Sequence, residues 1–347
     1  MRRLGGLFVV ALLFGALFFV AGSAHAQDGR LTLRLGQEAD SNPGRSESGT
    51  TAPDTATRLV VSGEGSWRHE DLRVDTSGLV GARAFANASD SDSVVVIGAL
   101  SGSYLAHPLL SARLSLGLRD TTERRRGRDF TLLNAGGSAR LGNSTVGLRV
   151  DAGGQRFHYK PDSDFGWFGP RAGVTIDYRL SDLFRLTLGG EWARRVFSRI
   201  DLGAAGRRLD TVLTLRSGVD AHWNWGTVEV GYSFANTRSN NEARNIVRHV
   251  VSPSVTAVPF GELLVRVSAT IQRARCAGNC VLDEFDRADE ETRNRMTIAL
   301  EHPLGTAWLW GEFRYTWFSQ AFGEGQTGVF RRHLGYVGLA IRQQTRE

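Results

Sequence analysis

The segment TVGLRVDAGGQRF, residues 145–157, decides the fold of this chain. Its apolar side chains, Val146 and Leu148 among them, alternate with polar positions such as Arg149 and Asp151. Residues at every second position share one face of a β-strand, whereas one face of a helix collects residues three and four apart. The segment therefore predicts a strand with one apolar face and one charged face.

The same alternation recurs along the chain and predicts about sixteen strands, within a range of 14 to 18. The expected spans are 30–39, 56–68, 72–86, 93–105, 109–121, 129–141, 145–158, 166–179, 183–197, 208–222, 227–238, 245–257, 263–275, 292–302, 307–319 and 331–343. The breaks between them alternate between short turns, such as Asn143-Ser144, and longer polar stretches, such as Arg199–Arg207. All the short turns of such an up-and-down sheet lie at one end and all the long loops at the other.

The composition of the 347 residues excludes several classes of protein. Apolar residues make up 41% and charged residues 22%, which fits neither a disordered chain nor a bundle of membrane helices. The 41 glycines argue against a helix-rich fold, and two cysteines cannot form a disulfide scaffold. A net charge of +6 with arginines spread along the chain is not the footprint of a nucleic-acid-binding protein.

The N-terminus has the pattern of a secretory signal peptide. Arg2 and Arg3 precede an apolar run over 4–22, and Ala24-His25-Ala26 has the small-x-small form of a cleavage site. We expect cleavage after Ala26, which leaves residues 27–347 as a single domain.

Two all-β folds are compatible with these strands, a soluble sandwich and a transmembrane barrel. Runs of ten to fifteen residues exceed the usual soluble strand and match a tilted membrane strand. The polar face also carries more charge than one side of a sandwich needs, and the tryptophans gather near predicted strand ends, as in the two aromatic girdles of membrane barrels. The pattern therefore predicts a transmembrane antiparallel β-barrel.

With this architecture the chain resembles Gram-negative outer-membrane β-barrel proteins of the porin-like kind. The resemblance covers the whole of residues 27–347, and the last strand, RHLGYVGLAI over 332–341, is similar to the assembly signal of that class, although it continues to Glu347. It implies outer-membrane localisation, short periplasmic turns, longer extracellular loops and contact with the barrel-assembly machinery.

The charged face of a barrel of this size lines a water-filled lumen. The candidate pore-lining residues are Arg34, Arg113, Arg119, Arg149, Arg171, Arg185, Arg266, Arg314, Asp151, Asp177, Glu229 and Glu312. An excess of arginine would favour anions, and the alternative is an arginine–carboxylate ladder that braces the wall without selecting solutes.

Three glycine pairs, Gly136-Gly137, Gly153-Gly154 and Gly189-Gly190, lie inside predicted strands. Glycine weakens an ordinary strand, so each pair requires a reason: curvature, close approach of neighbouring backbones, or small residues that leave room in the lumen.

Cys276 and Cys280 fall in a long loop, and in an exported chain we expect them to form a local disulfide. The scattered histidines show no metal-ligand spacing, and no nucleophile motif is present, so the sequence predicts neither a metal site, nor a cofactor, nor an enzyme.

The sequence thus predicts a porin-like transport channel for passive passage of small polar or anionic solutes. The alternatives are an export conduit for a surface polysaccharide, with partners from that export system, and a non-conducting structural or adhesive barrel. Outer-membrane lipid is an expected partner, and the arginine-rich stretch TERRRGR over 122–128 suits the phosphates of lipopolysaccharide.

Overall fold

The computed structural model describes residues 28–43, 52–125, 128–200, 206–276, 294–321 and 329–346. These residues form sixteen strands: β1 (Asp28–Asp40), β2 (Asp54–His69), β3 (Leu72–Phe85), β4 (Ser93–His107), β5 (Leu110–Glu123), β6 (Phe130–Gly142), β7 (Val146–Tyr159), β8 (Trp167–Arg179), β9 (Phe184–Ile200), β10 (Arg207–Trp223), β11 (Gly226–Ser239), β12 (Ile246–Ala257), β13 (Leu264–Cys276), β14 (Asn294–Pro303), β15 (Leu309–Ala321) and β16 (Val329–Arg346).

Three single 3₁₀ turns, η1 (Ser89–Ser91), η2 (Ser163–Phe165) and η3 (Glu242–Arg244), lie between strands. No helix in the described residues is long and apolar enough to cross a membrane.

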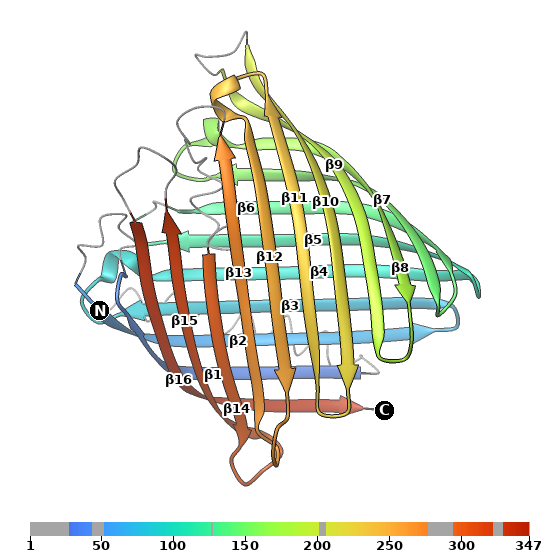
Figure 1. Ribbon diagram of the computed structural model, residues 1–347. Coiled ribbons are helices and arrows are strands. Elements are labelled where there is room, and N and C mark those ends of the chain that lie inside the picture. Colours follow the sequence, from blue (N-terminus) through green and yellow to red (C-terminus); the bar gives the residue numbers. More distant parts are fainter. Residues whose placement is uncertain are drawn as a thin grey trace.

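The strands form one closed antiparallel barrel in which each strand pairs with its neighbours in sequence (Figure 1). The ring closes where β1 pairs with β16, in an unbroken register from Asp28↔Arg346 to Asp40↔Leu334. Closure pairs the edge strands with each other, so the backbone N–H and C=O groups of the wall find partners within the sheet. The predicted fold class and strand number are confirmed, with strand ends displaced by at most three residues.

The two ends of the barrel differ as the spacing predicts. We call the end with the short β2–β3, β4–β5, β6–β7 and equivalent connections the turn end, and the opposite end, where β1–β2, β3–β4 and the other longer connections lie, the loop end. Several short turns need a residue with positive φ, among them Glu70 at 50° and Gly261 at 57°. The first and last described residues pair with each other at the turn end.

The outer face of the barrel is apolar and exposed. Leu114 is 73% exposed and Val337 is 62% exposed, and Leu100 on β4 pairs directly with Leu116 on β5. Since direct partners in a ladder share a face, such rows of apolar side chains surround the wall. A barrel with this outer surface buries it in hydrocarbon, which makes it a membrane-spanning barrel.

The opposite face lines the interior and carries the charged side chains. On β1, for example, Arg34 and Glu38 alternate with the outward Leu33 and Leu35. The interior face is therefore the charged face of the wall.

In each glycine pair, the residue on the interior face lies so close to the backbone of the facing strand that there is little room for a side chain. Gly136 on β6 pairs with Gly153 on β7, and a Cβ at either position would lie 2.9 or 2.3 Å from a carbonyl oxygen of the facing strand. A Cβ at Gly189 would lie 3.2 Å from the Val174 carbonyl oxygen of β8. The interior side of a curved wall is its crowded side, and of the three sequence-based readings, close approach accounts for these positions.

Candidate functional site

The predicted pore-lining residues fall on the interior face, opposite the exposed apolar rows. They lie on β1 (Arg34), β5 (Arg113, Arg119), β7 (Arg149, Asp151), β8 (Arg171, Asp177), β9 (Arg185), β11 (Glu229), β13 (Arg266) and β15 (Glu312, Arg314). Their environments differ, and the structure divides the interior arginines into those with a carboxylate partner and those without one.

The first paired group links four neighbouring strands across the β1–β16 seam. Arg34 Nε donates to Glu312 Oε1 at 3.0 Å, and Arg342 Nη2 donates to the same oxygen at 3.1 Å. Arg342 also pairs with Glu301 on β14. Arg34 on β1 reaches β15 because the positions of β16 between them are small, with Gly338 and Ala340 facing inward. Arg34 and Glu312, both sequence-predicted candidates, therefore neutralise each other.

Tyr336 covers the glycines of the same seam. Gly36 and Gly338 are direct partners, and a Cβ on either one would lie within 2.6 Å of the Tyr336 side chain. Tyr336 is only 5% exposed, and the Arg58 guanidinium carbon lies 5.8 Å from its ring centroid. An aromatic ring over two glycines restores the packing that a strand loses where it has no side chain.

A second group joins two arginines through one carboxylate. Arg58 on β2 and Arg83 on β3 are direct cross-strand partners, and both pair with Glu38, at 3.4 and 3.0 Å. The Glu38 side chain is 1% exposed. Two like charges directly opposite each other destabilise a sheet, and here a buried anion between them removes the repulsion.

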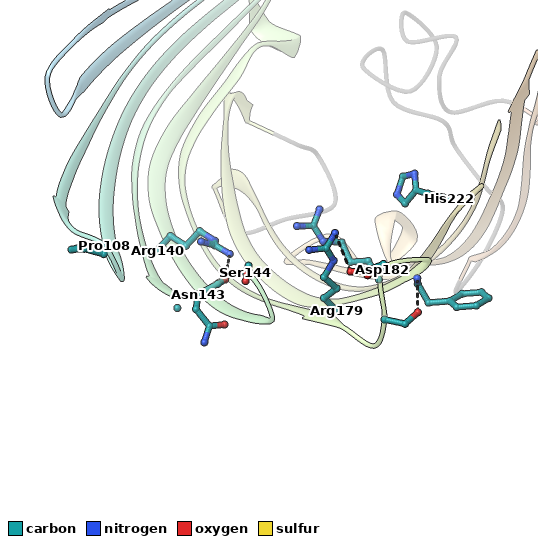
Figure 2. Close-up of a pocket in the computed structure, with 11 residues that line it drawn as sticks. Pro108, Arg140, Asn143, Ser144, Arg179, Asp182 and His222 are labelled. Atoms are coloured by element: carbon teal, nitrogen blue, oxygen red, sulfur yellow. Dashed lines mark hydrogen bonds and ion pairs between the residues drawn. The ribbon is translucent and has the colours of Figure 1, made fainter. Parts of the chain in front are cut away.

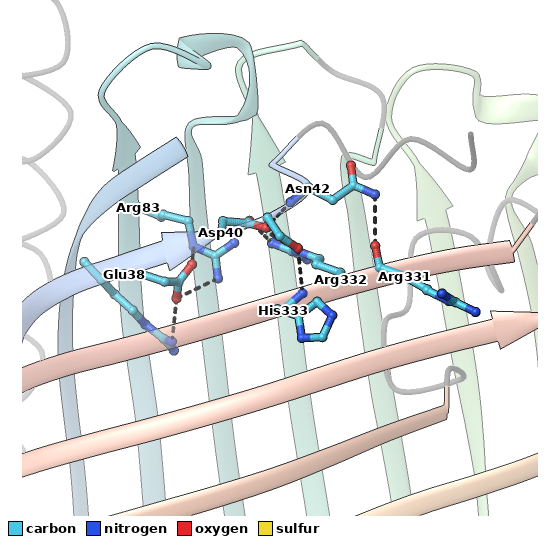
Figure 3. A network of polar contacts seen from close by, with 9 residues as sticks. Glu38, Asp40, Asn42, Arg83, Arg331, Arg332 and His333 are labelled. Carbon is cyan, nitrogen blue, oxygen red and sulfur yellow. Dashed lines mark hydrogen bonds and ion pairs between the residues drawn. The ribbon is translucent and has the colours of Figure 1, made fainter. Parts of the chain in front are cut away.

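The most deeply buried ion pair closes the loop end of the seam (Figure 3). Arg332 is 0% exposed, and its Nε and Nη2 atoms donate to the two oxygens of Asp40 at 3.0 and 2.5 Å. Asp40 also accepts the backbone N–H of Asn42, and Ser41 and His333 exchange two further hydrogen bonds. This network extends the β1–β16 pairing beyond the last residue of β1.

A second buried ion pair joins Arg208 and Asp210 on β10, with Nη2 and Oδ2 2.5 Å apart. The Arg208 guanidinium also lies over the ring of Phe197, 4.1 Å from its centroid.

Other interior arginines lack such partners. In the described parts of the chain no carboxylate lies within 4.0 Å of a guanidinium nitrogen of Arg113, Arg149, Arg171, Arg185 or Arg266. Arg113 instead donates to Ser101 at 2.7 Å, and Arg149 is 3.5 Å from the Thr175 hydroxyl. These five, all among the sequence-predicted candidates, keep their charge available to the lumen.

A cavity of about 540 Å³ opens at the turn end, between the β6–β7 and β8–β9 turns and β10 (Figure 2). Arg140, Arg179, Arg185 and His222 line it together with polar turn residues. Arg140 donates to the Asn143 carbonyl at 3.2 Å. The cavity is thus lined by more cationic than anionic groups.

A hydrophobic cluster on the interior face was not expected from the sequence. Phe130, Phe157, Trp167 and Phe197 are each at most 5% exposed and lie at the loop ends of four consecutive strands, β6 to β9. Arg195 lies 4.8 Å from the Trp167 ring centroid, so a cation faces the cluster. In the sequence, each of the strands β6 to β9 has an aromatic residue at a position that shares the interior face with the charged residues. Of these four aromatic residues, only Trp167 was recognised from the sequence as lying on that face.

In the described strands, outward-facing arginines lie only toward the loop end. We define the outer arginine band as six exposed residues on outward positions: Arg156, Arg194, Arg238, Arg273, Arg275 and Arg331. The one carboxylate at an outward position of the described strands, Asp120, is already paired with Lys160 at 2.8 Å. The band makes the two halves of the outer face electrically different.

Several predictions concern residues outside the described part of the chain. They include the signal peptide with its cleavage site after Ala26, and Cys280, so the disulfide to Cys276 at the end of β13 stays a prediction. Among the described residues no group of three or more His, Cys, Asp or Glu is arranged to hold a metal ion.

Comparison with known proteins finds related architectures but no relative in sequence. No protein-family model matches the chain, and no curated protein matches it. Solved structures that it resembles include a TodX monoaromatic hydrocarbon channel mutant (11% identity, TM-score 0.43, covering 96% of this chain and 94% of the other) and a Rhodopseudomonas blastica porin mutant (11%, 0.43, 91% and 99%). A bacterial polysaccharide outer membrane secretin is also similar (8%, 0.47, 92% and 98%). Likeness at this level assigns no activity to the chain.

Proposed function

We propose that this chain forms an outer-membrane channel for passive passage of small polar solutes, with a mild preference for anions. The observation that carries the proposal is the closed sixteen-strand wall with apolar rows outside and charged side chains inside. Barrels of eight strands are filled by their own side chains, whereas sixteen to eighteen strands leave an aqueous channel. Such a channel lowers the barrier that hydrocarbon presents to a polar solute.

The anion preference is supported by the division among the interior arginines. Arg34, Arg58, Arg83, Arg208 and Arg332 are neutralised by carboxylates. Five others, such as Arg113 and Arg149, have no carboxylate within 4.0 Å among the described residues. An unneutralised cation attracts anions into a pore. Carboxylates of the same face that have no arginine within 4.0 Å among the described residues, such as Asp151, Asp177 and Glu229, offset part of this charge, so the preference comes from the excess of unpaired arginines over them.

The outer arginine band supports an orientation. Guanidinium groups pair well with phosphate, and the outer leaflet of a Gram-negative outer membrane is rich in lipopolysaccharide phosphates. The loop end would then face outward, and the short turns would face the periplasm.

The proposal is tested by reconstituting the purified protein in planar bilayers. We expect stepwise ion conductance, and a reversal potential under a salt gradient that shows anions to be favoured. The double variant Arg113→Glu, Arg149→Glu should shift the reversal potential toward cations, because it converts two unneutralised cations into anions. The paired variant Arg30→Glu, Glu64→Arg exchanges an exposed ion pair without changing the net charge and should leave the reversal potential unchanged.

Absence of conductance from protein that shows heat-modifiable migration would overturn the channel and favour a closed scaffold. Conductance without ion selectivity would leave the channel and remove the anion preference.

A further inference from the structure

We propose that the turn-end cavity is a binding site for a small polyvalent oxyanion, a solute that carries phosphate or several carboxylate groups. This deepens the proposed function, since it names a solute class for the channel and a place where that solute pauses. The proposal stands on three observations: paired arginines, a cavity between them, and an occupied site of the same design elsewhere in the barrel.

Two pairs of interior arginines face each other directly at the turn end. Arg140 on β6 is the partner of Arg149 on β7, and Arg179 on β8 is the partner of Arg185 on β9. Like charges in directly opposed positions repel and destabilise a sheet unless an anion separates them. Two such doublets on consecutive hairpins form an arrangement that a bound anion would stabilise.

Another arginine doublet in the same barrel binds a carboxylate of the protein itself. Arg58 and Arg83 are direct partners in the same way, and the Glu38 carboxylate lies between them, at 3.4 and 3.0 Å. A further turn-end doublet, Arg68 and Arg73, has the Asp75 carboxylate 2.7 Å from Arg73 Nε. The protein thus supplies its own anion to two doublets.

The doublets at the turn-end cavity receive no comparable carboxylate from the described chain. The nearest is Asp182, 3.9 Å from Arg179, whose side chain is 98% exposed and therefore well screened by water. Asp220 is the direct partner of Arg185, yet the two groups are more than 4.0 Å apart. Asp151 and Asp177 share the interior face, and neither is ion-paired with Arg140 or Arg149.

The space between the doublets fits a small solute. The cavity of about 540 Å³ lies within the usual range of small-molecule sites, and Arg140, Arg179 and Arg185 all line it (Figure 2). Ser144, Ser181 and His222 add neutral or titratable donors around the same space. Guanidinium groups on two hairpins can each donate two hydrogen bonds to an oxyanion, which favours a ligand with more than one charged group.

The first test measures binding without requiring an open channel. Detergent-solubilised protein is titrated with inorganic pyrophosphate and, separately, with citrate, and heat is measured by calorimetry. We expect saturable binding of at least one probe. The probe that binds with the higher affinity shows whether the site prefers phosphoryl or carboxylate groups. The double variant Arg179→Gln, Arg185→Gln should weaken that binding at least tenfold, because it removes two charge-assisted donors.

The matched control is the double variant Arg68→Gln, Arg73→Gln, which removes the same charge from the turn-end doublet beside Asp75. It should change the affinity less than twofold. Equal loss in both variants would show that total charge matters and would overturn the site, as would absence of binding by either probe to folded wild-type protein.

The second test uses planar bilayers with the probe on the turn side. We expect concentration-dependent reduction of the chloride current in the wild type and in the control, and at least tenfold more probe for the same reduction in Arg179→Gln, Arg185→Gln. Binding without any conductance would keep the site and overturn the channel, whereas a chloride current that neither probe affects, together with no heat of binding, would keep the channel and overturn the site.

Discussion

At the scale of single residues, burial decides what each arginine of the wall can do. The Arg332 and Asp40 side chains are both 0% exposed, whereas the Arg30 and Glu64 side chains are 55% and 60% exposed. A buried charge that loses its partner keeps its full desolvation cost, but an exposed one regains water. The loss of the carboxylate from an arginine–carboxylate pair should therefore cost much more at the buried pair than at the exposed one.

We predict that Asp40→Ala destabilises the barrel by about 3–5 kcal/mol, because it leaves the Arg332 guanidinium buried without its anion. The measurement is the denaturant midpoint of the heat-modifiable band on a gel. Glu64→Ala, the control, should cost less than about 1 kcal/mol. Similar losses in both variants would show that burial does not set the strength of these pairs.

At the scale of strands and connections, aspartates at the loop end hold the backbone of the neighbouring loops. Asp54 accepts the N–H groups of Asn87 and Ala88, at 2.9 and 2.7 Å. Asp92 accepts from Phe85 at 2.7 Å, and Asp129 accepts from Glu123 at 2.5 Å. Carboxylates satisfy donors that the strand ladder leaves unpaired, so each loop is tied to the strand ends beside it.

One of these aspartates predicts a pH dependence. Burial raises the pKa of the Asp92 carboxyl. The hydrogen bond from the Phe85 N–H and the charge of Arg124, whose Nη1 lies 4.0 Å from Asp92 Oδ2, lower it by less than burial raises it. A carboxyl with a raised pKa in the folded state binds its proton more readily there than in the opened loop. The β3–β4 loop should therefore gain stability as the pH falls through the raised pKa, and lose that contribution as the pH rises.

We expect hydrogen exchange over residues 86–92, corrected for intrinsic rates, to slow relative to the rest of the barrel between about pH 7 and about pH 4. Asp92→Asn cannot titrate and should not show this part of the slowing. If the variant and the wild type change in parallel, another group is responsible.

At the scale of the whole molecule, the barrel is asymmetric along its axis. The turn end carries the doublets Arg140–Arg149 and Arg179–Arg185 inside, and the loop end carries the outer arginine band outside. A barrel inserted between leaflets of different charge is favoured in one orientation by such a band. Each exposed cation near an anionic surface contributes about 1 kcal/mol.

We predict that the triple variant Arg194→Gln, Arg238→Gln, Arg273→Gln loses most of the stabilisation that added lipopolysaccharide gives to the detergent-solubilised barrel. The measurement is the shift in heat-modification temperature on titration with lipopolysaccharide. Arg113→Gln, Arg149→Gln and Arg266→Gln combined remove equal charge from the interior and should leave the shift intact. An unchanged shift in the outer triple variant would contradict the proposed orientation.

The strands were predictable because alternation is a local property of the chain. In the segment 145–157 each side chain takes the face that its parity predicts, and the predicted strand 145–158 is observed as Val146–Tyr159. Closure and strand number followed from the repeated spacing, since an even number of antiparallel strands with short connections pairs each strand with its neighbour. The expectation of two aromatic girdles is wrong for Trp167 and Trp310. They share the parity of charged residues and lie on the interior face beside Arg195 and Arg342, so neither faces lipid.

The partners of the charges required the folded molecule. Parity places Arg34, Arg149 and Glu312 on the interior face, but Arg34 meets Glu312 because β16 between them is small at Gly338 and Ala340. Likewise, Arg140 and Arg149 oppose each other only in the observed β6–β7 register, and a shift of that register would separate them. Alternation along a strand depends only on neighbouring residues in the sequence. Neutralisation of a charge depends on distances between side chains on different strands, and closure of the barrel and strand register together determine those distances.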